Sequence, residues 1–223
     1  TVAEDIGIGH RGIFYEHAGV VRDIVQNHMM QLLGLIAMDP PSGFDANFIR
    51  DEKLKVMRSI RPMDESYIDN CTVKGQYGPG IVDGVPVPGY RQEADVSLES
   101  DQATFFAAKL YIDNLRWAGV PFFIRTGKRM PTLVTEICIE LKRLPLRLFG
   151  RTCDALNPNV VRLTIQPDEK ISLGFGVKYP FSTNQIYYVN MVFSYAATFK
   201  VELRKPYERL LVDILKGDLT LFV

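Results

Sequence analysis

Apolar side chains recur from Gly19 to Met38 at the spacing of an amphipathic helix. At about 3.6 residues per turn, this helix is expected to bury a stripe made of Val21, Ile24, Val25, Leu32 and Leu35. His28 falls inside the stripe. An unpartnered imidazole there would cost about 1 to 3 kcal/mol, so we expect it to be hydrogen-bonded, bound to a ligand, or facing a cleft.

The same helix carries an acidic side chain, Asp23, and two further polar side chains, Gln26 and Asn27. A hydrogen-bonded core histidine is the ordinary explanation for His28, but this polar surplus favours a binding cleft. In an α-helix, five residues separate Asp23 from His28 by about 7.5 Å of rise and about 140° of rotation. The two side chains are therefore not expected to pair, although they could hold two ends of one polar ligand.

The pattern predicts a second helix from Asn47 to Ile60 and a last one from Pro206 to Lys216. The second helix is expected to bury one face, formed by Phe48, Leu54, Met57 and Ile60. Glycine and proline crowd the segment from Gly75 to Gly89, which excludes a helix or a central strand there.

Past this segment the hydrophobic period changes to two, which is typical of β-strands. Strands are predicted at Thr104 to Ile112, Pro121 to Thr126, Thr135 to Leu141, Val160 to Gln166, Ile171 to Phe175 and Ile186 to Tyr195. In the third of these, Ile137, Ile139 and Leu141 are expected to face the core while Glu136 and Glu140 face water. Helices followed by strands indicate an α+β fold with a large, mostly antiparallel sheet and helices packed on one side. We expect residues 1–223 to form a single domain.

Composition narrows the function. The 223 residues carry 26 basic and 26 acidic side chains, so there is no net charge to attract nucleic acid. No apolar run reaches the roughly 18 residues of a membrane span. Three cysteines, Cys71, Cys138 and Cys153, are odd in number and lack the spacing of a metal site, which favours a reducing compartment such as the cytoplasm. The chain opens without methionine and closes on the apolar LTLFV, so we expect a piece of a longer protein.

Two short motifs invite a functional interpretation. Gly7, Gly9 and Gly12 have the spacing of a dinucleotide-binding turn, but no buried strand precedes them, so a glycine-rich turn leading to the helix is preferred. Arg125, Lys128 and Arg129 follow the apolar PFFI strand. They are interpreted either as solvated charges at a strand end or as an anion clamp for a phosphate.

Several blocks together resemble the glucose-6-phosphate dehydrogenase family: EDIG, GVVRDIVQNHMMQLLGLIAMDPP, RDEKLKVMRSI, GQYG, PGYRQE, ATFFAAKLYIDNLRWAGVPFFIRTGKRMP, IQPDE and YERLLVDILKGDLTLF. They occur in the family's order along the whole chain and match its larger C-terminal domain. The resemblance implies oxidation of glucose 6-phosphate to 6-phosphogluconolactone, with hydride transfer to NADP, or NAD in some members, at the entry of the oxidative pentose phosphate pathway. It also implies a homodimer or homotetramer formed through the sheet.

The resemblance assigns roles to four residues. His28 matches the general base, which takes the proton of the sugar's C1 hydroxyl as hydride leaves C1. Asp23 and Glu4 match carboxylates that accept hydrogen bonds from sugar hydroxyls. Lys128 matches the first of two cations at the substrate site.

The chain also departs from the family pattern. Leu133 stands where a second cation is usual, so substrate affinity is expected to be weaker unless another cation, with Arg129 the nearest, takes the role. Thr164 replaces an arginine found in many members, although Arg162 lies two residues earlier, which makes an additional structural NADP site doubtful.

The family's coenzyme turn and its Asp-His-Tyr-Leu-Gly-Lys segment belong upstream of residue 1. We therefore expect the isolated chain to be inactive or nearly so. Two other hypotheses remain open: a non-catalytic assembly module of the same enzyme, and a sugar-phosphate isomerase or binding protein that uses His28 without a nicotinamide.

Overall fold

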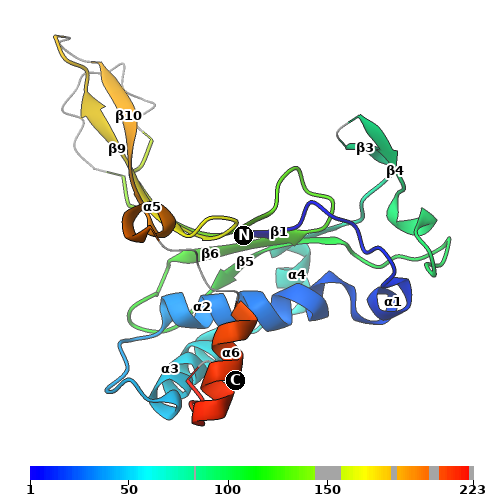
Figure 1. Ribbon diagram of the computed structural model, residues 1–223, viewed down its shortest axis with the longest axis horizontal. Coiled ribbons are helices and arrows are strands. Elements are labelled where there is room, and N and C mark those ends of the chain that lie inside the picture. The colour runs from blue at the N-terminus through cyan, green and yellow to red at the C-terminus, as the bar shows by residue number, and fades with distance from the viewer. Residues whose placement is uncertain (83, 144–156, 182–184, 201–205, 221–223) are drawn as a thin grey trace. The chain divides into compact units, whose positions relative to one another are not determined.

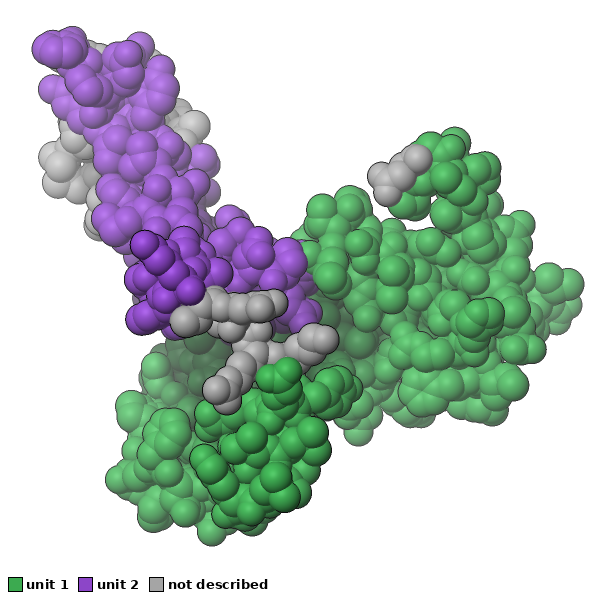
Figure 2. Space-filling view, in the orientation of Figure 1, with its two compact units in different colours: residues 1–133, 204–223 green, residues 134–203 purple. Residues whose placement is uncertain are grey.

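The computed structural model describes residues 1–82, 84–143, 157–181, 185–200 and 206–220. The chain divides into two compact units, residues 1–133 with 204–223 and residues 134–203, which Figure 2 colours separately. The first unit combines helices with strands, and the second consists mainly of strands. Antiparallel pairing dominates in both units, so the predicted α+β class is confirmed.

The first unit contains four neighbouring strands in the order β1-β6-β5-β2. Their bounds are β1 Val2–Ala3, β2 Thr72–Gly75, β5 Phe105–Tyr111 and β6 Pro121–Gly127. β1 runs parallel to β6, whereas β5 is antiparallel to both β6 and β2. The glycine- and proline-rich segment forms a small separate hairpin of β3 (Gly80–Val82) and β4 (Val85–Val87), in agreement with the predicted exclusion of a helix or a central strand.

The helices of this unit are α1 Gly12–Val20, η1 Val21–Met29, α2 Met30–Ala37, α3 Ala46–Ser59, α4 Glu65–Cys71, the short η2 Tyr90–Gln92 and α6 Pro206–Lys216. The predicted last helix is therefore confirmed. The first three follow one another in the chain, and α2 lies next to α3 (Figure 1). Gly19 interrupts α1 with a φ of 61°, a left-handed value that glycine adopts without strain.

The core of the first unit lies between the helices and the strands. It includes Ile24, Val25, Met29, Leu33 and Ala37 from the helices and Phe106, Ala108, Leu110 and Ile124 from the strands. The predicted stripe is only partly right, because Val21 and Leu35 are 39% and 48% exposed. His28 is exposed as well, so its predicted burial is wrong. The reason is that η1 is a π-helix, whose wider turns rotate side chains away from α-helical positions.

The buried face of α3 also differs from the prediction. Ile49 and Val56 are buried, whereas Phe48 and Leu54 are 46% and 44% exposed. Ile49 and Val56 are seven residues apart, which is close to two full turns of an α-helix, so they share one face. Asp45 fixes the start of this helix, because its Oδ1 accepts a hydrogen bond of 2.9 Å from the Asn47 backbone N–H.

The second unit consists of β7 Val134–Glu140, β8 Val160–Gln166, β9 Lys170–Lys178, β10 Ile186–Ser194 and the short helix α5 Tyr195–Phe199. Each strand pairs antiparallel with the next in the chain. The six predicted strands are confirmed, with β9 longer than expected. Ile139 and Leu141, predicted to face a core, are 39% and 43% exposed, so the expectation of one dry face is wrong here.

Candidate active site

Two strands bring the first pair of site residues together. β1 and β6 run parallel, with Val2 opposite Thr126 and Ala3 opposite Gly127. Glu4 and Lys128 are the next residues on each chain segment. The Glu4 backbone N–H donates a hydrogen bond of 3.0 Å to the Gly127 carbonyl, which keeps the two segments together beyond the last strand residues. Parallel strands therefore place Glu4 and Lys128 at the same end of the sheet.

The Lys128 ammonium joins two carboxylates. It donates a hydrogen bond to Glu4 Oε2, and its Nζ lies 3.7 Å from Asp23 Oδ2 on η1. The Lys128 side chain is 1% exposed, while those of Glu4 and Asp23 are 25% and 15% exposed. Glu4, Asp23 and Lys128 are called the Lys128 cluster below. The structure thus brings together three of the four residues that the sequence singled out.

The charge balance of the Lys128 cluster favours a ligand that donates hydrogen bonds. A buried ammonium is tolerated only when opposite charges compensate it, and the two carboxylates do so. With one cation and two anions, the cluster keeps an excess of negative charge. Ionised carboxylates have no proton to donate, so the exposed parts of Glu4 and Asp23 can only accept hydrogen bonds, for example from hydroxyl groups.

The anion clamp considered from the sequence is not formed. Lys128 is bound by carboxylates, and the Arg129 Nη2 lies 3.4 Å from Glu93 Oε1. Arg125 is exposed on β6. The three cations face different surroundings and do not converge on one point, so this interpretation is corrected.

The side chains of His28 and Asp23 point in more similar directions around the helix axis than the sequence predicted. A π-helix bonds each residue to the fifth one along, so residues five apart are about one turn apart. Asp23 and His28 are five apart within η1, from Val21 to Met29, and therefore project toward the same side of the helix. The estimate of 140° assumed an α-helix and is wrong. π-helical turns often occur at functional sites.

Tyrosine rings pack beneath the Lys128 cluster. The Lys128 Nζ lies 5.4 Å from the centroid of the Tyr15 ring, and Tyr15 itself is 0% exposed. The rings of Tyr15 and Tyr77 each meet that of Tyr90 edge to face, at centroid distances of 5.8 Å. Burial, and then the charge of Asp23, raise the pKa of the Tyr15 hydroxyl. No periodic pattern in the sequence points to Tyr15.

The glycines of the dinucleotide-like motif have structural tasks. A Cβ atom on Gly12 would overlap the backbone carbonyl oxygen of Ala94. A Cβ on Gly7 would lie 2.7 Å from Glu93 Oε1, and Gly9 has a φ of 55°. These contacts explain the glycines without a coenzyme, in agreement with the turn predicted from the sequence.

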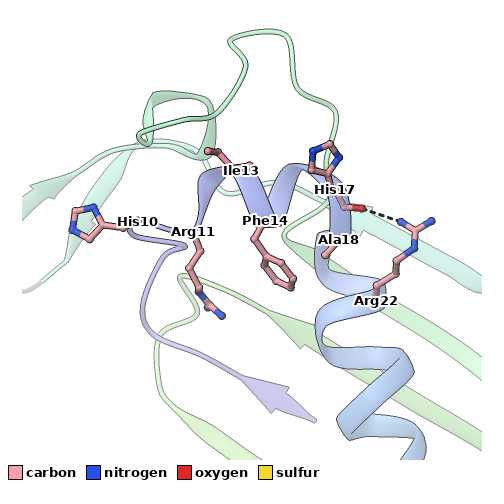
Figure 3. Close-up of a pocket in the computed structure, with 7 residues that line it drawn as sticks. All are labelled: His10, Arg11, Ile13, Phe14, His17, Ala18 and Arg22. Atoms are coloured by element: carbon pink, nitrogen blue, oxygen red, sulfur yellow. Dashed lines mark hydrogen bonds between the residues drawn. The ribbon is translucent and has the colours of Figure 1, made fainter.

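A separate pocket of about 580 Å³ opens along α1 and is drawn in Figure 3. It is lined by His10, Arg11, Ile13, Phe14, His17, Ala18 and Arg22. The Arg22 guanidinium donates a hydrogen bond of 3.2 Å to the His17 carbonyl. None of the residues that the sequence singled out lines this pocket.

Comparison with known proteins decides the family. The family profile described as "Glucose-6-phosphate dehydrogenase, C-terminal domain" matches residues 1–223. The chain belongs to the glucose-6-phosphate dehydrogenase family. The glucose-6-phosphate 1-dehydrogenases of Chlamydia pneumoniae and Bacillus subtilis are 45% and 43% identical to it over its whole length. The chain spans 43% and 45% of the length of these two relatives.

Solved structures of glucose-6-phosphate dehydrogenases have the same fold. A glucose-6-phosphate dehydrogenase in complex with its substrate glucose-6-phosphate matches the whole chain with a TM-score of 0.86 at 34% identity. The glucose-6-phosphate 1-dehydrogenase of Mycobacterium avium matches it with a TM-score of 0.80 at 36% identity. The chain covers 44% of each of these structures.

The structure shows the surroundings of the residues that depart from the glucose-6-phosphate dehydrogenase pattern. Leu133 is 42% exposed. In the second unit, Thr164 is buried in β8, and the Arg162 Nε lies 3.1 Å from Glu136 Oε2. Arg162 is therefore engaged by a carboxylate.

The residues that the structure describes contain no group of three metal-ligating side chains that could hold a metal ion. In the same residues, no helix combines the length and apolar character needed to cross a bilayer.

Proposed function

We propose that this chain is the C-terminal part of a glucose-6-phosphate 1-dehydrogenase, which oxidises glucose 6-phosphate to 6-phosphogluconolactone and uses NADP as hydride acceptor. The family match over residues 1–223 supports the enzyme class. The structural neighbour that holds glucose-6-phosphate supports the substrate. In this proposal the chain is one domain of a longer enzyme.

The Lys128 cluster, together with His28 on the same side of η1, is the observation that carries the proposal. Glu4 and Asp23 accept hydrogen bonds from sugar hydroxyls, and Lys128 fixes these carboxylates from below. His28 is exposed and stands about one helical turn from Asp23. Histidine is the side chain most often used as a general base, and here it removes the proton of the C1 hydroxyl.

The NADP site is assigned to a segment that precedes residue 1. Two of the glycines that resemble a coenzyme turn are closely packed, because a Cβ would meet Glu93 at Gly7 and the backbone of Ala94 at Gly12. They do not fit a coenzyme. The same upstream segment supplies the carboxylate that orients His28, so the isolated chain is expected to turn over poorly.

The three histidines of the chain allow a matched test. In the complete enzyme, His28→Asn should lower kcat by about 10²- to 10⁴-fold, the usual contribution of a general base. His10→Asn and His17→Asn, both at exposed positions, should leave kcat within about twofold. The rate of NADPH formation at 340 nm measures this. An active His28→Asn enzyme would refute the assignment of the base.

Assembly is the second function that we propose, because the second unit presents many apolar side chains. The exposed ones on β10 are Tyr187, Tyr188, Val189, Met191, Val192 and Phe193. Alternate side chains of a strand share one face, so Tyr187, Val189, Met191 and Phe193 form an apolar row of the kind that marks protein interfaces. The proposed partner is a second copy of this chain, in a homodimer or homotetramer formed through these strands.

Sedimentation velocity of the complete enzyme tests the assembly. Met191→Glu places a charge on a side chain that is 64% exposed and should shift the protein toward monomers. Met63→Glu, at a position that is 37% exposed in the first unit, is the control and should leave the oligomer intact. Equal sedimentation of all three proteins would exclude β10 as the interface.

A further inference from the structure

Lys128 is the least exposed member of the Lys128 cluster. Its side chain is 1% exposed, whereas those of Glu4 and Asp23 are 25% and 15% exposed. Because its ammonium joins the two carboxylates, whatever positions this ammonium also positions them.

Tyr15 is the aromatic side chain that meets this ammonium. The Lys128 Nζ lies 5.4 Å from the centre of the Tyr15 ring, within the range of about 6 Å at which a cation is attracted to a ring face. Tyr15 is 0% exposed, so water does not weaken this attraction. Tyr90 holds the ring from the side by an edge-to-face contact. The Tyr15 ring is thus held in place by its neighbours, and the Lys128 ammonium lies over its face.

The hydroxyl groups of Tyr15 and Tyr90 differ in their hydrogen bonding. Within the described part of the chain it has no hydrogen-bond partner. By contrast, the Tyr90 hydroxyl, also fully buried, donates a hydrogen bond of 2.6 Å to Glu16. Because burial and the charge of Asp23 raise its pKa, the Tyr15 hydroxyl stays protonated and uncharged at neutral pH. Tyr15 therefore adds no negative charge to the Lys128 cluster.

We propose that Tyr15 is a positioning residue, whose ring holds the Lys128 ammonium between Glu4 and Asp23 and thereby sets where the two carboxylates meet the sugar. The kinetic consequence of this inference rests on the proposed function. The geometry of Tyr15 and Lys128 does not, because it is a property of the folded chain. The competing explanation is that Tyr15 only fills the core.

Kinetics of the complete enzyme separate the two explanations. Tyr15→Phe keeps the ring face and should leave KM for glucose 6-phosphate within about twofold. Tyr15→Leu removes the ring and should raise KM by about 2- to 30-fold, the range expected for a buried cation–ring contact. The change in kcat should be smaller, because His28 is untouched.

Ile112→Ala is the matched control. It truncates another fully buried side chain of the same hydrophobic core but leaves the Tyr15 ring, its neighbour Tyr90 and Lys128 intact. KM should stay near the wild-type value in this variant, even if its melting temperature falls as far as that of Tyr15→Leu. An equal rise of KM in Ile112→Ala and Tyr15→Leu would mean that Tyr15 only fills the core, and the proposal would fail.

Crystal structures of the same variants test the geometry without any activity. In Tyr15→Phe the Lys128 Nζ should remain within about 4 Å of both carboxylates. In Tyr15→Leu it should lose at least one of them. An unchanged Lys128 cluster in Tyr15→Leu would overturn the proposal. If instead the wild-type enzyme fails to oxidise glucose 6-phosphate, the proposed function fails while this structural comparison still decides the role of Tyr15.

Discussion

The Lys128 ammonium and the Glu4 carboxylate meet at the common end of two parallel strands. These residues are 124 positions apart in the chain, and they become neighbours because β1 pairs with β6 in parallel register. β1 contains only two residues. A very short strand is therefore sufficient to deliver one carboxylate of the Lys128 cluster to its cation.

Removal of the cation should destabilise the fold. Lys128→Met leaves Glu4 and Asp23 without their shared partner, and loss of one partner from a buried ion pair costs about 3 kcal/mol. Urea unfolding measures the change. Lys55→Met is the control, because Lys55 pairs with Glu52 on the surface of α3 with 69% of its side chain exposed, and its loss should hardly change the unfolding transition. Equal effects of the two substitutions would contradict the structural importance of Lys128.

Neutral replacements of the carboxylates should weaken substrate binding. Glu4→Gln and Asp23→Asn keep the size of each side chain but lose the charge that strengthens hydrogen bonds from sugar hydroxyls. A hydrogen bond to a charged group contributes about 1.5 to 3 kcal/mol, so KM for glucose 6-phosphate should rise by about 10- to 100-fold in the complete enzyme. Glu99→Gln, at an exposed position, should have no effect. The role assigned to the carboxylates would be wrong if KM were unchanged.

Gly12 should not tolerate a side chain. Its Cβ would overlap the carbonyl oxygen of Ala94, and backbone atoms cannot move aside as a flexible side chain can. Gly12→Ala is expected to cost about 1 to 3 kcal/mol of unfolding free energy. Gly78→Ala is the matched control, since its Cβ would meet no atom within 4 Å. Similar melting temperatures for both variants would show that the segment around Ala94 moves freely.

Stability should fall at alkaline pH. Burial, opposed by a hydrogen bond from the Ile8 backbone N–H and assisted by Glu93, raises the pKa of Tyr77 to about 12 from the ordinary value of 10. Between pH 10 and 12 the unfolded chain then releases this proton more readily than the folded chain, so the free energy of unfolding decreases as pH rises. Urea unfolding at pH 9, 10 and 11 measures the slope. Tyr77→Phe should make the slope less steep, and the remainder comes from Tyr15 and Tyr90, whose pKa values are also raised by burial. An unchanged slope in Tyr77→Phe would contradict the contribution of Tyr77.

Hydrophobic periodicity predicted the strands well, because a period of two depends on local chain geometry. Val160 to Gln166 was placed residue for residue. The helix around His28 was less predictable, because its hydrogen-bond pattern departs from the α-helix on which the expected stripe depended. Val21 and His28 were consequently assigned to the wrong face.

Local sequence singled out Asp23, His28 and Lys128, and the family resemblance added Glu4, but neither predicted how these residues are arranged. Local sequence could not show that Lys128 is buried or that Tyr15 lies under it, since both facts depend on contacts between distant segments. The spacing of Gly7 and Gly12 suggested a nucleotide turn that tertiary packing explains differently. Local sequence patterns thus predicted helices and strands, whereas the arrangement of the candidate site depends on contacts between segments that are distant in the sequence.

The π-helical turns restrict how many positions can separate Asp23 from His28 in this chain. In an α-helix, a separation of four positions would keep the two side chains on one side, and a separation of five would not. A single deletion or insertion in this stretch would therefore be tolerated only if the hydrogen-bond pattern of the helix changed with it. Sequence length and backbone geometry are coupled here, so a helix that looks ordinary in composition is restricted in how it can evolve.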